Sequence, residues 1–276
     1  MNTTLLKALQ IKAKHQVYTY LSGNNLSKMF AQGYDFAQLR EYQQGDDIRK
    51  INWSITAKLQ KPYIKELHAN KELSVVVATL MDATLYFGKD NKKQKTITEV
   101  ATLLGYAIQQ NNDLFRGIIY TQNQTYMTPP TKQLYHIEEF SKHLYTTPLL
   151  ETTLNQQKAV NSLFTHIHKP SLVFVIGDFL TPIDLSILAQ KHEVIAIEVR
   201  EKNEENPKNL GEVILQNPQN NQTLDTYFGK RNIQTYKKRL LEHDEKLESH
   251  FLKYGIRHSK VYTNDEVIGK LVKLFS

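Results

Sequence analysis

The stretch Leu73-Ser-Val-Val-Val-Ala-Thr-Leu-Met81 decides the fold class. It is rich in β-branched residues and apolar at consecutive positions, which is typical of a strand that is buried on both faces. A strand covered on both faces requires helices above and below its sheet, as in α/β proteins. We therefore expect the flanking sequence to supply further buried strands and the helices that cover them.

The sequence downstream of this stretch meets that expectation. Short apolar runs predict further strands over 114–121, 172–176, 193–199 and 260–262, with a hairpin-like return at Gln122-Asn123. Apolar residues at helical spacing fall between and after these runs, over 95–110, 132–145, 151–168, 183–190 and 233–254. Strands that alternate with helices indicate βαβ units and a mainly parallel sheet. We predict one doubly wound α/β domain over 73–276, preceded by an irregular, partly β segment over 1–72.

Composition narrows the classes of protein and of site. The chain has 276 residues, of which 40% are hydrophobic and 23% are charged, which is enough apolar material for a core and too much for intrinsic disorder. The absence of cysteine excludes disulfides, cysteine nucleophiles and thiolate metal sites. The apolar runs are far shorter than the ~20 residues of a membrane-spanning helix, and the amino terminus lacks the apolar core of a secretory signal. We expect a cytoplasmic protein.

The net charge of +7 is concentrated near the amino terminus. Residues 1–72 hold 11 Lys and Arg against 6 Asp and Glu. This excess permits binding to a phosphate backbone, but the sequence has no zinc-finger spacing and no cluster of basic and aromatic residues. A solvated surface is the simpler interpretation, and nucleic-acid binding through the basic first quarter stays an alternative.

Two aspartates follow predicted buried strands. Asp82 comes directly after Met81, and Asp178 follows the strand 172–176 and Gly177. In an open parallel sheet, ligands bind beyond the carboxyl ends of the strands, so both carboxylates face one crevice if their strands are neighbours. With the nearby hydroxyl of Thr84 they form an oxygen-rich set suited to Mg²⁺. The alternative is that each aspartate caps the helical turn that follows it.

The residues Arg40-Glu-Tyr-Gln-Gln-Gly-Asp-Asp-Ile-Arg-Lys-Ile-Asn-Trp53 form the densest cluster of charged and aromatic residues. Gly45 with Asp46 and Asp47 is a turn signal, and two arginines flank that turn closely enough for bidentate bridges to the carboxylates. The turn either docks on the α/β body through its apolar residues or presents Arg and Trp to a partner.

This cluster resembles the signature R-x-Y-x-x-G-D-D-x-R-x-I-x-W of the DUF58 family. The residues that carry the match are Arg40, Tyr42, Gly45, Asp46, Asp47, Arg49, Ile51 and Trp53. The stretches 33–36, 63–66 and 176–179 are similar to the G-x-E-F, Y-V-K-E and S-D-F motifs of the family. The resemblance covers roughly residues 20–275 and implies a von Willebrand factor A-like domain, a Rossmann-like fold that agrees with the doubly wound prediction.

The resemblance also implies a metal-ion-dependent adhesion site. In A-domains, Mg²⁺ is held by D-x-S-x-S, a threonine of a second loop and an aspartate of a third. Carried over to this chain, the ligands are Asp82, Thr84, Thr147 and Asp178. Tyr86 replaces the last serine of the first motif, so one direct oxygen ligand is lost. We expect a degenerate site, with either Mg²⁺ or no cofactor.

Family members are often encoded beside MoxR-type AAA+ ATPases and other A-domain proteins. The resemblance therefore implies a non-enzymatic adaptor whose partner is such an ATPase or another A-domain protein. The alternative activity is that of a metal-dependent hydrolase or nuclease that uses Asp82 and Asp178. The sequence names no nucleophile or general base to accompany them.

Overall fold

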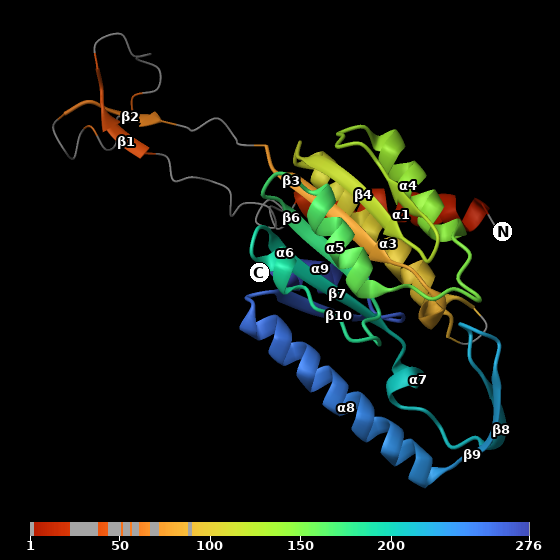
Figure 1. Cartoon of the computed structure of the whole chain (residues 1–276). Coiled ribbons are helices and arrows are strands. Elements are labelled where there is room, and N and C mark those ends of the chain that lie inside the picture. Colours follow the sequence, from red (N-terminus) through yellow and green to blue (C-terminus); the bar gives the residue numbers. More distant parts are fainter. Residues whose placement is uncertain are drawn as a thin grey trace.

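Most of the chain forms one α/β unit. The computed structural model describes residues 3–22, 38–43, 51, 56, 61–66, 72–87 and 90–275. The strands of the main sheet are β3 (Ser74–Leu80), β4 (Leu114–Tyr120), β5 (Thr125–Met127), β6 (Leu172–Gly177), β7 (Glu193–Arg200) and β10 (Arg257–Tyr262). Within the described residues, these six strands lie in the order β10-β7-β6-β3-β4-β5 (Figure 1). All neighbouring pairs are parallel except β4 and β5, which form the expected hairpin.

Helices cover both faces of this sheet (Figure 1). One face packs against α1 (Thr3–Ser22), α3 (Lys92–Gln110), α4 (Leu134–Thr146) and α9 (Val267–Phe275). The other face packs against α5 (Gln156–His166), α6 (Ser186–Ala189) and α8 (Lys230–Lys253). The alternation of side chains along a strand divides β3 between the two faces: Val75 and Val77 point to the first, Val76 and Ala78 to the second. The predicted doubly wound, mainly parallel α/β fold is confirmed.

The amino-terminal helix α1 belongs to this unit. Its residues Ala13 and Val17 are buried in the same cluster as the apolar face of α3, and Lys12 forms an ion pair of 2.7 Å with Glu99. The sequence predicts an irregular, partly β segment over 1–72, so this helix is unexpected. The apolar residues of α1 are spread around the helix, with Leu5 and Ile11 exposed, and therefore form no clear amphipathic stripe. The domain division at residue 72 stays a prediction.

The remaining strands form two separate ribbons within the described residues. β1 (Gln38–Glu41) pairs antiparallel with β2 (Tyr63–Glu66), so the stretch that resembles the Y-V-K-E motif is a strand. β8 (Gly211–Gln216) pairs antiparallel with β9 (Thr223–Phe228), and this hairpin leads directly into α8. No described helix combines the length and apolarity that are required to cross a membrane.

Candidate functional site

The carboxyl ends of three neighbouring strands bring the candidate carboxylates together. β3 pairs in parallel with β6, and β6 with β7, as the shared crevice requires. Asp82 follows β3, Asp178 follows β6, and α7 (Lys202–Glu205) begins directly after β7. Asp178 is close enough for its charge to raise the pKa of Asp82, so the two predicted aspartates face one crevice.

Asp82 is a buried capping residue of the turn that follows β3. Its Oδ1 accepts hydrogen bonds from the backbone N–H of Thr84 at 3.0 Å and from the Thr84 hydroxyl at 2.5 Å. Its Oδ2 accepts from the backbone N–H of Leu154 at 3.3 Å. The pKa of Asp82 is raised, mainly by burial and also by the charge of Asp178. The hydrogen bonds from Thr84 and Leu154 oppose this shift but do not cancel it. The capping role is the one observed for this residue.

Asp178 lies in an ion pair with a lysine that the sequence interpretation did not consider. Nζ of Lys93 lies 3.0 Å from Oδ2 of Asp178 and 2.8 Å from Oε1 of Glu204 in α7. The three side chains are 1%, 2% and 6% exposed, respectively. Burial raises the pKa of Glu204, against the opposing influence of Lys93. The ammonium of Lys93 is therefore the positive charge that links the end of β6 to α7.

The sequence holds one signal for Lys93. It precedes Ile97, Val100 and Leu104 on the buried stripe of α3, at the i, i+4, i+7 and i+11 positions. A charge on that stripe, one turn before the first apolar residue, indicates a buried cation that needs a partner. No comparable local pattern marks Glu204, which is 111 residues away along the chain.

The backbone directly after Asp178 adopts an unusual conformation. Phe179 has a φ of 46°, in the left-handed region that bulky residues rarely adopt, and its side chain is fully buried. Its carbonyl lies 2.7 Å from Nε2 of His243, and its ring packs edge-on against Phe251 of α8. Such a conformation costs about 1–3 kcal/mol and persists only where the surroundings impose it. Packing against α8 thus fixes the loop that carries Asp178.

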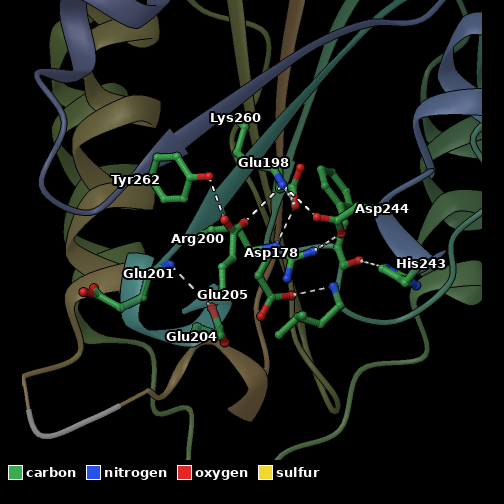
Figure 2. Close-up of polar contacts among 12 residues, drawn as sticks. Asp178, Glu198, Arg200, Glu201, Glu204, Glu205, His243, Asp244, Lys260 and Tyr262 are labelled. Carbon is green, nitrogen blue, oxygen red and sulfur yellow. Dashed lines mark hydrogen bonds and ion pairs between the residues drawn. The ribbon is translucent and has the colours of Figure 1, made fainter. Parts of the chain in front are cut away.

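A second charged cluster extends from this crevice along β7. Figure 2 shows charged side chains of β7, α7, α8 and β10 facing one another. Arg200 bonds to Glu198 at 2.6 Å and to Asp244 of α8 at 3.1 Å. Lys260 of β10 bonds to Asp244 at 2.8 Å and to Glu205 at 3.1 Å. These contacts attach α8 and α7 to the carboxyl end of the sheet.

The electrostatic environment of this cluster follows from these contacts. Burial alone would raise the pKa of Glu198, but the hydrogen bond with His258 and the charges of Arg200 and Lys260 lower it. Burial and the hydrogen bond to Glu205 raise the pKa of Tyr262 to about 12. Tyr262 is therefore neutral at physiological pH, and its hydroxyl donates a hydrogen bond of 2.7 Å to Oε2 of Glu205.

The expected hydroxyl ligands lie on two different hollows. Thr84 and Tyr86 line a cavity of about 610 Å³ together with Glu204 and the turn between β8 and β9. Thr147 lines a smaller hollow of about 310 Å³ with Tyr126 and His143. The Thr147 hydroxyl donates to the carbonyl of His143 at 2.7 Å, at the end of α4. The structure thus groups Asp82, Thr84 and Asp178, while Thr147 ends a helix beside them.

The donor set of the crevice does not suit a divalent cation. Both carboxylate oxygens of Asp82 accept hydrogen bonds from the chain, and those of Asp178 accept from Lys93 and the backbone N–H of Leu180. Within the described residues, no group of three His, Asp or Glu side chains is arranged to hold a metal ion. The oxygens that a cation would need are engaged by protein donors.

The signature cluster is only partly described. Arg40 lies in β1, opposite Ile64 of β2, and the backbone N–H of Tyr42 donates to Pro62 at 2.8 Å. The remaining members that we proposed as a partner-binding or structural cluster lie outside the described residues: Gly45, Asp46, Asp47, Arg49 and Trp53.

Comparisons with known proteins find relatives of the chain and name no activity. Uncharacterized proteins of Mycobacterium tuberculosis and Mycobacterium bovis are 25% identical over 218 residues, which cover 76% of this chain and 69% of theirs.

Two solved structures share 10% sequence identity with the chain. One is a conserved hypothetical protein, BatB, from Bacteroides thetaiotaomicron, matched with a TM-score of 0.40 over 73% of this chain and 99% of that one. The other is an aerotolerance-related membrane protein from Bacteroides fragilis, with a TM-score of 0.43 over 73% and 96%. The family model described as "Protein of unknown function DUF58" matches residues 38–246. Since that match spans well over half of the sequence, the chain belongs to the DUF58 family.

Proposed function

We propose that this protein is a non-enzymatic interaction module of the von Willebrand factor A-like type, which acts as an adaptor for a MoxR-like AAA+ ATPase. The observation that carries the proposal is the surface of the β8–β9 hairpin. Large apolar side chains are exposed there, beside the cavity of about 610 Å³ at the carboxyl end of the sheet. The choice of ATPase rests on the family resemblance.

The hairpin exposes several large apolar side chains to solvent. Ile214 of β8 is 71% exposed, and Leu224 and Tyr227 of β9 are 61% and 60% exposed. Within the described residues, β8 and β9 pair only with each other, so each strand also keeps an outer edge for pairing. Exposed apolar side chains beside a hollow are typical of a surface that binds another protein. We call the residues 210–228 the hairpin surface.

The crevice gives little support to the alternative of a hydrolase or nuclease. A metal-dependent mechanism needs free carboxylate oxygens, whereas those of Asp82 and Asp178 are bonded to the chain. A general base must reach the reacting group, but Nε2 of His243 is bonded to the carbonyl of Phe179. These contacts favour a structural role for the crevice and a binding role for the surface beside it.

The test is a binding titration between the full chain and a purified MoxR-like AAA+ ATPase from the same organism. We expect the double variant Ile214→Ser, Leu224→Ser to lose at least about tenfold in affinity, as removal of anchor residues does. The matched control is Leu252→Ser, which is 85% exposed near the other end of α8. The variants replace exposed residues, so the melting temperature should stay near that of the wild type.

Three outcomes count against the proposal. If the ATPase fails to bind the wild-type chain, the partner is wrong. If the hairpin variant binds as well as wild type, the surface is wrong. Hydrolysis of a phosphodiester or phosphomonoester that Asp178→Asn abolishes would show an enzyme in place of an adaptor.

A further inference from the structure

The buried position of Lys93 requires an explanation. Lysine is almost never fully buried unless it is paired, because its charge loses the solvation of water. Lys93 lies in the second position of α3, and its side chain is 1% exposed. Its ammonium bonds to two carboxylates from segments that are 85 and 111 residues away along the chain. The helix α3 places the lysine on its buried face, and these two carboxylates compensate the charge there.

One oxygen from each of two carboxylates converges on the ammonium of Lys93. Oδ2 of Asp178 and Oε1 of Glu204 lie 3.0 and 2.8 Å from one nitrogen atom. A hard cation such as Ca²⁺ binds oxygens at about 2.3–2.6 Å, so a shift of a few tenths of an ångström would bring these two oxygens within its coordination distance. An ammonium and a divalent cation cannot share these oxygens, since they would occupy the same position.

We propose that the ammonium of Lys93 is the permanent cation of this crevice, and that it takes the place, beside Asp178, of the divalent metal ion which the family resemblance leads one to expect. A partner that approaches this edge of the sheet consequently meets no open metal coordination position. The inference concerns ion binding by the chain alone, so it stands whether or not the proposed ATPase binds.

The proposal predicts a gain of metal binding when the lysine is removed. Lys93→Met keeps a long apolar stem and deletes the charge, which leaves Asp178 and Glu204 without their cation. The matched control is Lys95→Met, an exposed lysine of the same helix turn. Calorimetric titrations with Mg²⁺ and with Ca²⁺ compare these two variants with the wild type.

We expect no saturable binding by wild type or by Lys95→Met. Lys93→Met should bind one ion at least about tenfold more tightly than any residual binding by wild type. Adding Asp178→Asn to Lys93→Met should abolish that site. The ion should also raise the melting temperature of Lys93→Met and leave that of wild type unchanged, because it binds only the folded form of the variant.

A charge-balanced variant covers the case in which Lys93→Met does not fold. Lys93→Met with Glu204→Gln deletes one positive and one negative charge and leaves Asp82 and Asp178 for the ion. Ion binding by either folded variant supports the proposal. Wild-type binding that Asp178→Asn removes, or folded variants that bind no ion, would overturn it.

Discussion

Nε of Arg200 donates a hydrogen bond of 2.6 Å to Glu198, two residues earlier in the same strand, and neither side chain is more than 1% exposed. The period of two along β7 places both side chains on the face that α8 covers. Lys260 stands opposite Glu198 in the register of β10, and Asp244 of α8 accepts from both Arg200 and Lys260. One buried carboxylate in the sheet thus organises the charges that hold α8.

Replacing Glu198 by Gln should destabilise the protein by about 3–5 kcal/mol, because Arg200 would keep its charge in a buried position without its closest anion. Urea unfolding at neutral pH measures this loss. The matched control is Glu193→Gln in the same strand, where the carboxylate is 53% exposed and pairs with Arg257. That surface pair should contribute less than about 1 kcal/mol. Equal losses in the two variants would show that burial does not matter here.

The stability difference between wild type and Asp82→Asn should change with pH. Burial raises the pKa of Asp82 above 3.8 in the folded chain. Below that pH the carboxyl is protonated in both the folded and the unfolded chain, so its burial does not lower the stability through ionisation. As the pH rises, the unfolded chain ionises first, so wild type loses stability until the pH passes the raised pKa. Asp82→Asn lacks this loss. Its stability relative to wild type should therefore increase from about pH 4 toward neutral pH.

Urea unfolding of wild type and Asp82→Asn across that range provides the measurement. The direction of change is informative even if the amide weakens the hydrogen bonds to Thr84 and Leu154, because that loss does not depend on pH. A relative stability of the variant that decreases with rising pH would mean that the folded chain prefers an ionised Asp82.

Sequence periodicity predicts the body of the fold because each buried strand carries its own local signal. The β-branched run over 73–81 and the helical spacing over 95–110 each correspond to one observed element, β3 and α3. The hairpin surface escaped prediction for the opposite reason. Its apolar side chains Ile214 and Leu224 are exposed, so no burial pattern marks the strands. Periodic sequence patterns reveal residues that are buried in a core, and this hairpin contributes little to the core.

In the candidate site, too, the sequence predicts the residues that carry a local signal and misses those that do not. Asp82 and Asp178 were found because each one follows a predictable strand at the edge where parallel strands end. Lys93 and Glu204 were missed because their pairing joins segments 111 residues apart. The resemblance to A-domains does not supply them either, because it implies a metal ion near Asp178, where we propose that Lys93 is the cation. Only the spatial arrangement reveals which charge neutralises the crevice.

The close packing of α4 on β4 depends on the missing side chain of Gly117. A Cβ atom at this position would lie 2.5 Å from the ring of Phe140, which is fully buried. Gly117→Ala should therefore destabilise the protein by about 1–3 kcal/mol, measured by urea unfolding. The control is Gly269→Ala in α9, where a Cβ atom would lie 3.7 Å from Oε2 of Glu266. There the helix gains up to about 1 kcal/mol from alanine. Opposite signs for the two variants are the expected result.

Glu151 fixes the tip of the hairpin surface over the crevice. Its backbone N–H donates to the carbonyl of Pro218 at 2.8 Å, and its carboxylate accepts from the side chain of Asn221. Glu151→Ala removes the second contact and keeps the first. We expect faster hydrogen exchange over 211–228, since one lost hydrogen bond lowers the local opening energy by about 0.5–1.5 kcal/mol.

The loosened hairpin should leave the melting temperature of the α/β body unchanged, because Glu151 is exposed and lies outside both buried apolar clusters. Glu212→Ala, an exposed carboxylate within β8, is the control for a change of charge alone. If exchange over 211–228 rises equally in both variants, the net charge governs the hairpin and the contact with Asn221 does not. If it rises only in Glu151→Ala, the loop that follows α4 sets the position of the surface that we propose as the docking site.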